Sequence, residues 1–301
     1  MKRAAFILVL GLLAAGCGGS SSGSGAENGP IALSSQGGLT EKHGLFLREP
    51  DGKLRRLTTA RDLYPAFSHD GKRIAYVHTQ RGLVPGTGLL MVADADGNNA
   101  HQVGDLVAGA LQIAWSPDDG SLVYSSAKNG LWTVGADGNG AKRIFKDLGD
   151  ASWSPDGRIV LARPAHALTT MNADGTDVRE LLRPKTPPKA ILPDTYSVPA
   201  WSPDGKRIAY VLKVWLPSKT FLFPTTIETV NPDGSGREVV TKVFDSTLTT
   251  LSWSPDGKII AFTDNRDDVI GLWQIPFVGG EAKLLIDSTH YFMPSWGPAG
   301  T

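Results

Sequence analysis

Histidine and aspartate are the residue types in this chain that could transfer protons or hold a metal ion. His78, His166, His290, Asp62 and Asp264 fall in segments of variable length between repeated motifs. None of them has the short spacing of a metal-binding motif, and the GxSxG, HExxH, CxxC and P-loop motifs do not occur. We therefore assign no catalytic residue, no metal site and no cofactor. We keep a set of four polar residues as candidates for the mouth of a channel: His78, His166, Asp264 and His290.

Repeated Asp-Gly pairs are a second place where a cation could bind. Calcium loops need further carboxylates at fixed offsets and a closing Glu, and segments such as NPDGSG (231–236) lack them. Asp-Gly between β-prone runs is a strong hairpin signal. The pairs therefore predict turns and no metal site.

The single cysteine ends an apolar N-terminal segment. Lys2 and Arg3 precede twelve residues (4–15) that read as the apolar part of an export signal, and that stretch is shorter than the roughly twenty residues needed to span a bilayer. The sequence AAGC (14–17) resembles a bacterial lipoprotein box, which implies lipid attachment at Cys17. We expect a signal peptide at 1–16 and a lipidated, Gly/Ser-rich tether at 17–29. A plain signal peptide with a coincidental cysteine is the alternative.

One phrase recurs through the rest of the chain and predicts the elements that position these residues. It reads AFSHDGKRIAY (66–76), AWSPDDGSLVY (114–124), SWSPDGRIVLA (152–162), AWSPDGKRIAY (200–210) and SWSPDGKIIAF (252–262), and it begins again as PSWGP (294–298). Ser-Pro-Asp-Gly suits a tight turn between antiparallel strands, and a second hairpin with an Asp-Gly turn follows. Two hairpins per repeat make a four-stranded blade.

The fold class is therefore all-β, a six-bladed β-propeller with four-stranded antiparallel blades over residues 30–301. Five phrases are complete, and the sixth blade is divided between the ends of the chain. Residues 30–34 and 44–58 supply its last three strands, and 291–296 supplies the first. The C-terminal strand should pair into the N-terminal blade and close the ring, which removes exposed sheet edges. One aromatic residue per repeat is expected to pack in the core: Phe67, Trp115, Trp153, Trp201, Trp253 and Trp296.

The WSPDGK phrase with its following Asp-Gly hairpin resembles the propeller repeat of the TolB family, over nearly all of residues 30–300. The segment FTDNRD (262–267) is similar to that family's FTSDRDG segment. The resemblance implies a protein partner. TolB proteins carry a further N-terminal domain for which this chain has no room, so we expect a lipoprotein form without it. Three departures from the phrase, His69 for Pro, an inserted Asp119 and Gly297 for Ser, look like repeat decay, and we assign them no chemistry.

Two long loops form the candidate partner surface. The SPDG and Asp-Gly turns should share one rim, and the variable loops should lie on the opposite rim, where binding usually resides. Loops 183–199 and 212–225 are neighbours there and are rich in aromatic residues and prolines. The alternative is that these side chains fold over the central channel or lengthen the strands of the fifth blade. The candidates are Tyr196, Trp215, Leu216, Phe221 and Phe223.

The charge balance excludes a simple electrostatic partner. Thirty basic and thirty acidic side chains give no case for nucleic acid or for an anionic membrane surface. We expect a lipid-anchored, exported module of the bacterial cell envelope that binds an envelope protein through the loop face and channel mouth. Two alternatives stay open: a propeller lyase or hydrolase that uses rim His and Asp residues, and a sensor of a small molecule or glycan.

Overall fold

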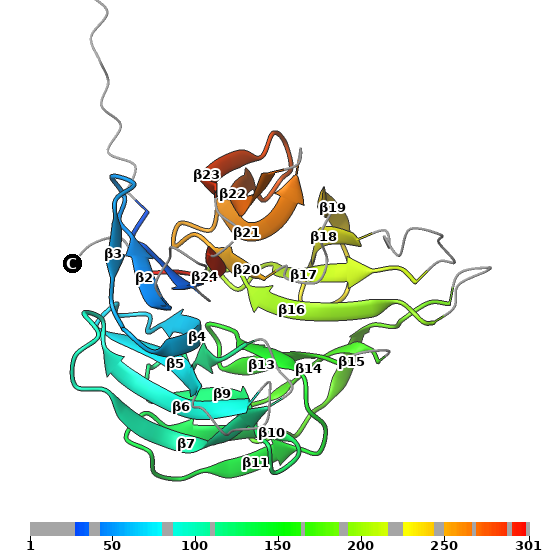
Figure 1. Ribbon diagram of the computed structural model, residues 1–301. Helices are drawn as coiled ribbons and strands as arrows, with labels where there is room; N and C mark the ends of the chain where they lie inside the picture. Colours follow the sequence, from blue (N-terminus) through cyan, green and yellow to red (C-terminus); the bar gives the residue numbers. More distant parts are fainter. Residues whose placement is uncertain are drawn as a thin grey trace, which may run out of the picture.

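The computed structural model describes residues 28–35, 43–79, 87–108, 112–163, 166–186, 192–215, 225–243, 250–266, 269–287 and 291–298. These residues form six four-stranded sheets, all of them antiparallel, arranged as a ring (Figure 1). The predicted six-bladed propeller is confirmed. The predicted signal peptide and the Cys17 tether lie outside the described residues.

Each sheet is one blade, numbered here from the blade that contains both ends of the chain. From the inner strand outward, blade 1 contains β24 (Tyr291–Trp296), β1 (Ile31–Ser35), β2 (Gly44–Arg48) and β3 (Leu54–Arg56). Blade 2 contains β4 (Arg61–Phe67), β5 (Arg73–Thr79), β6 (Thr87–Asp94) and β7 (His101–Ala108). Blade 3 contains β8 (Ala114–Trp115), β9 (Ser121–Ser125), β10 (Leu131–Gly135) and β11 (Lys142–Phe145).

The remaining three blades follow the same order. Blade 4 contains β12 (Asp150–Trp153), β13 (Arg158–Ala162), β14 (Leu168–Asn172) and β15 (Arg179–Leu182). Blade 5 contains β16 (Thr195–Trp201), β17 (Ile208–Lys213), β18 (Thr225–Val230) and β19 (Glu238–Val243). Blade 6 contains β20 (Leu251–Trp253), β21 (Ile259–Arg266), β22 (Val269–Pro276) and β23 (Lys283–Asp287).

The recurring phrase forms the first hairpin of each blade, as its turn chemistry predicts. In blade 4, the N–H of Gly157 donates to the carbonyl of Ser154 (3.0 Å), and the Ser154 hydroxyl accepts a hydrogen bond from the N–H of Arg158 (2.7 Å). Gly157 has φ +85°, a backbone conformation that glycine adopts without steric cost. The turn is therefore fixed locally, by four residues of sequence.

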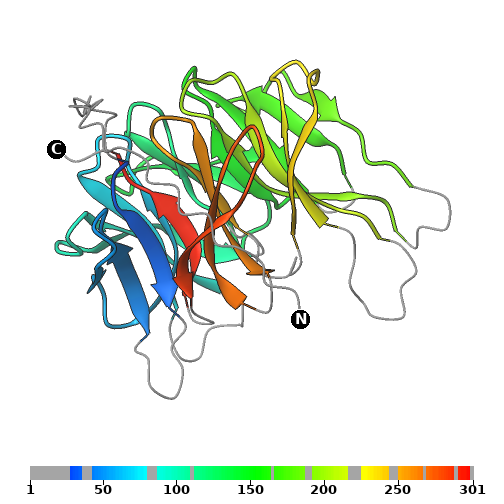
Figure 2. The same ribbon diagram turned by 90° about the horizontal axis from the view of Figure 1, so that it is seen from above.

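The C-terminal strand closes the ring. β24 pairs antiparallel with β1, with Trp296 opposite Ile31, and Figure 2 shows the red and dark blue strands side by side. The N–H of Trp296 also donates to the Ser252 hydroxyl of blade 6 (3.0 Å). The predicted closure of the ring between the chain ends is confirmed.

The core lies between the blades. Six apolar clusters correspond to the six junctions between neighbouring blades; for example, Trp115 packs with Val77 of blade 2, and Ile31 packs with Leu272 of blade 6. No blade could bury these faces alone, as in other repeat folds. Within the described ranges, no helix is long and apolar enough to cross a bilayer.

Candidate binding channel

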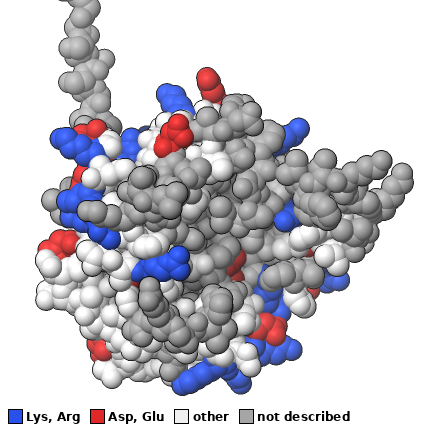
Figure 3. Space-filling model, viewed as in Figure 1, with Lys and Arg blue, Asp and Glu red and all other residues white. Residues whose placement is uncertain are grey.

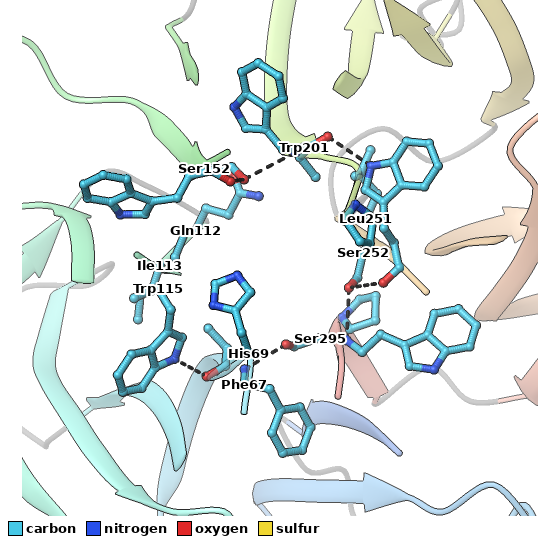
Figure 4. A pocket seen from close by; sticks show the side chains of 18 of the residues that line it. Phe67, His69, Gln112, Ile113, Trp115, Ser152, Trp201, Leu251, Ser252 and Ser295 are labelled. Carbon is cyan, nitrogen blue, oxygen red and sulfur yellow. Dashed lines mark hydrogen bonds between the residues drawn. The ribbon is translucent and has the colours of Figure 1, made fainter. Parts of the chain in front are cut away.

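The six inner strands surround a cavity of about 490 Å³ on the axis of the ring (Figure 4). The residue before each repeat aromatic lines this cavity and is small: Ala66, Ala114, Ser152, Ala200, Ser252 and Ser295. Successive side chains of a strand point to opposite sides, so the aromatic rings turn away from the axis, as Figure 4 shows for Trp115 and Trp201. Small side chains on the axis leave the space open.

Hydrogen bonds between blades hold this lining in place. Where the small residue is serine, its hydroxyl accepts the backbone N–H of the next blade's aromatic residue: Trp201 to Ser152 (3.4 Å), Trp296 to Ser252 (3.0 Å) and Phe67 to Ser295 (3.0 Å). In two junctions with alanine, the indole N–H donates to the alanine carbonyl: Trp115 to Ala66 (2.8 Å) and Trp253 to Ala200 (3.0 Å). The cavity is thus preformed by the fold.

Bulged residues line the part of the cavity that lies away from the SPDG turns. Tyr64, Val198 and Met293 line it, each three residues before the aromatic of its strand and directly before a proline. They have φ of 54°, 43° and 61°, which non-glycine residues rarely adopt. From blade 3, the side-chain amide of Gln112 donates to the carbonyl of Pro199 in blade 5 (3.0 Å). One side chain, that of Gln112, therefore links blade 3 to the backbone of blade 5 at this end of the channel.

At its other end the cavity reaches the SPDG turns, where one residue of each blade forms a collar. Five blades contribute proline, and blade 2 contributes histidine: Pro117, Pro155, Pro203, Pro255, Pro298 and His69. In three junctions, the collar proline packs close to the turn glycine of the next blade: Pro298 at Gly71, Pro155 at Gly205 and Pro203 at Gly257. The collar is therefore rigid and apolar at every position except His69.

His69 is held by the residue that the next blade inserts. Its ring Nδ1 lies 2.8 Å from Oδ1 of Asp119, and the same carboxylate accepts the backbone N–H groups of His69 (2.7 Å) and Asp70 (2.9 Å). Asp119 is buried with φ +56°, and Arg73 donates to its carbonyl (2.6 Å). Two departures that sequence analysis treated as unrelated repeat decay are therefore in direct contact.

The described lining of the cavity has no permanently charged side chain. Among the described residues that line it there is no Asp, Glu, Lys or Arg, and His69 and Tyr64 are the titratable groups. Burial, and then the negative charge of Asp150, raises the pKa of Tyr64, so its hydroxyl stays protonated. On the face shown in Figure 3, basic and acidic side chains are interspersed mainly around the edge of the disc. A ligand of this channel should be uncharged, because the described lining combines apolar side chains with neutral hydroxyl, amide and imidazole groups.

Comparison with known proteins identifies the architecture. No protein-family model and no curated protein matches the sequence. TolB from Acinetobacter baumannii matches the structure with a TM-score of 0.72 and 20% identity, over 91% of this chain and 68% of that chain. A putative TolB from Agrobacterium tumefaciens matches with a TM-score of 0.59 and 19% identity, over 88% and 91%.

The chain folds as a TolB-like propeller. The same fold extends to an oligogalacturonate lyase from Vibrio parahaemolyticus, with a TM-score of 0.53 and 18% identity, over 82% of this chain and 72% of that chain. At such identities the likeness concerns the fold, and function has to be argued from the site.

The predicted partner-binding residues of this TolB-like propeller have different environments. Tyr196 is 1% exposed. Its ring packs edge-on against Tyr210 (5.6 Å), and its hydroxyl donates to the carbonyl of Arg183 (3.1 Å), so it is a core residue and cannot form an exposed patch. Trp215 is half-buried, donates to the Thr195 hydroxyl (2.8 Å) and packs under Lys213 (4.4 Å). Three further candidates lie outside the described residues: Leu216, Phe221 and Phe223.

The candidate polar residues do not converge in the described part of the TolB-like propeller. Nδ1 of His78 contacts Oδ1 of Asp62 (2.7 Å), and that carboxylate is 2% exposed. His166 is exposed, Asp264 is buried on β21, and neither lines the cavity. His290 lies outside the described residues. In the described ranges no group of three His, Cys, Asp or Glu residues could hold a metal ion.

His69, the polar residue of the collar, was not among the candidates predicted from the sequence. His69 and Asp119 both depart from the SPDG turn, in consecutive repeats. Consecutive repeats form neighbouring blades, so equivalent turns of two consecutive repeats lie next to each other. The presence of a departure in both turns was therefore the signal that could have predicted the contact.

Proposed function

We propose that this TolB-like propeller is a non-enzymatic binding module that takes an uncharged segment of a partner protein into its channel through the collar. The observation that carries the proposal is the preformed cavity, whose described lining combines apolar side chains with neutral hydroxyl and amide groups and the imidazole of His69. Rigid prolines and fixed small residues lose little entropy when a ligand binds. The loop face expected from the sequence would then be a second contact area.

We also propose that the module works outside the cytoplasmic membrane, tethered by a lipid on Cys17. The basic and apolar N-terminal residues and the AAGC sequence support this location. Metabolic labelling with a radioactive fatty acid tests it. We expect label on the parent chain and none on Cys17→Ser, with the variant released from the membrane fraction; label on both would contradict attachment at Cys17.

An enzymatic role is the second candidate, because an oligogalacturonate lyase shares the fold and because His69 with Asp119 could move a proton. A proton-transfer site needs a second polar group that faces the reacting atoms. In the described lining, the other titratable side chain is Tyr64, which lies on the bulge of its strand rather than in the collar beside His69, and whose pKa is raised by burial. A binding role therefore fits the channel better than a reaction.

Photocrosslinking in the native cell tests the binding role. A photoreactive side chain replaces Pro155 in the collar, with matched probes at Trp215 on the opposite rim and at Val278, which is 74% exposed in the β22–β23 turn. We expect one dominant adduct at Pro155 and little at Val278. An adduct at Trp215 alone would support the loop face instead.

A blocked channel is the decisive control. Ala114 lines the cavity and is partly exposed to it, so Ala114→Phe places a ring on the axis. We expect this change to abolish the Pro155 adduct while the protein remains folded by circular dichroism. An unchanged adduct would mean that the partner binds outside the channel.

A further inference from the structure

The collar has near six-fold symmetry, and one position breaks it. Five prolines present only apolar ring atoms to the channel mouth, whereas His69 presents an imidazole whose side chain is 56% exposed. A ligand that contacted prolines alone could sit in several equivalent rotations about the axis. A single polar group at the mouth would select one of them.

Asp119 determines which nitrogen of His69 faces the channel. A carboxylate accepts hydrogen bonds, so in the neutral ring Nδ1 carries the proton that is donated to Asp119 (2.8 Å). Nε2 is then the acceptor. Figure 4 shows the imidazole directed towards the centre of the cavity, and no hydrogen bond in the described part of the chain engages Nε2.

The backbone alone does not explain this arrangement. Any residue other than proline at position 69 has an N–H, and Asp119 Oδ1 satisfies it (2.7 Å). The need for an acceptor of this N–H explains the presence of Asp119. It does not explain histidine at position 69, because alanine or serine there would present the same N–H. The imidazole adds a second contact to the same carboxylate, which fixes the ring over the channel mouth.

We propose that His69 orients the ligand of the channel by accepting, at Nε2, a hydrogen bond from an N–H or O–H donor of an otherwise apolar partner segment. Asp119 is the positioning residue that holds the tautomer. The inference rests on the proposed binding function and specifies its ligand class: an uncharged segment with one donor at the level of the collar, such as a phenol hydroxyl or an amide N–H.

Phenol and toluene are the probes, because they have similar shapes and differ in the donor. Their dissociation constants are measured by NMR on the full chain, on His69→Ala, which keeps the backbone N–H for Asp119, and on Pro155→Ala, the equivalent collar position of blade 4. One hydrogen bond to Nε2 changes the phenol-to-toluene affinity ratio roughly fivefold. We expect that preference for phenol to fall by this factor in His69→Ala and to persist in Pro155→Ala.

The ring nitrogens give a readout that does not need a variant. In ¹⁵N spectra of the parent chain recorded where the His69 ring is neutral, we expect its proton on Nδ1, and an Nε2 shift on adding phenol but not toluene. A proton on Nε2, or an affinity ratio unchanged by His69→Ala while both probes bind, overturns the role of His69 and leaves the channel as a binding site. No binding by the parent chain, or equal binding by Ala114→Phe, overturns both proposals.

Discussion

Glu228 lies on β18 inside blade 5, where it is 3% exposed and satisfies three donors. The Tyr210 hydroxyl (2.8 Å), the Thr226 hydroxyl (2.9 Å) and Nε of Arg237 (2.5 Å) all donate to its carboxylate. The hydrogen bond to Glu228 raises the pKa of Arg237. Burial, and then the charge of Glu228, raises the pKa of Tyr210. This polar cluster joins β17, β18 and Arg237, the residue before β19, within blade 5.

At the residue scale, Glu228→Ala should therefore be costly. It leaves the solvent-accessible Arg237 and the Tyr210 hydroxyl without their acceptor, and the loss of these hydrogen bonds to a charged group costs about 2 kcal/mol. Glu238→Ala is the matched control, because its side chain is 63% exposed and its partner Arg207 keeps Asn231, Thr229 and Gly236. Urea unfolding measures the free energy of unfolding of both variants. An equal decrease in the two would show that the hydrogen bonds of Glu228 contribute no more to stability than those of the exposed Glu238.

At the scale of elements, the junctions between blades are not equivalent. The indole N–H of Trp296 on β24 donates to the carbonyl of Gly29 (3.0 Å), so it ties the last strand to the start of the propeller. The indole N–H of Trp153 on β12 is buried without a partner in the described residues. At the junction of blades 3 and 4, Ala114 stands where other blades have serine, so no serine hydroxyl can accept the N–H of Trp153. In the described residues the indole N–H of Trp153 does not bond to the Ala114 carbonyl either.

Replacing each of these two tryptophans with phenylalanine separates the hydrogen bond from the packing. Trp296→Phe removes the bond that helps to close the ring, and we expect it to cost about 1 kcal/mol more than Trp153→Phe. The latter removes an N–H that has no partner and should be close to neutral. Thermal unfolding of the two variants checks the order, and a larger loss for Trp153→Phe would contradict it.

At the scale of the whole molecule, the aspartates of the repeated turns together make the stability of the fold depend on pH. Hydrogen bonds from serine or threonine hydroxyls lower the pKa of the turn aspartates Asp118, Asp174, Asp204 and Asp233 below the ordinary 3.8. A pKa lowered by folding contributes stability that is present above the ordinary value and is lost as pH falls through the native one. Burial raises the pKa of Asp194, which acts in the opposite direction.

We therefore expect the melting temperature to be steady near pH 6 and to fall below about pH 4. Asp118→Asn should reduce this acid sensitivity, because an amide still accepts hydrogen bonds but does not titrate. Calorimetry between pH 6 and pH 3 makes the comparison. A melting temperature that rises on acidification would show that buried carboxylates such as Asp194 dominate.

The sequence by itself determined the blades, their number and the closure of the ring. Each SPDG turn is specified by four adjacent residues, and the strand missing from the N-terminal blade stands at 291–296, so these features needed only local chemistry and complementary ends. The family resemblance gave the same architecture, and the structural neighbours agree with it.

Only the tertiary structure decided where the cavity lies and which residues line it. The cavity, the proline collar and the contact of His69 with Asp119 need six blades in place, because residues fifty positions apart come together only across a junction. Burial of Tyr196 is likewise set by Tyr210 on the neighbouring strand. Turn chemistry is local and readable from the chain, whereas a channel on the axis belongs to no single repeat.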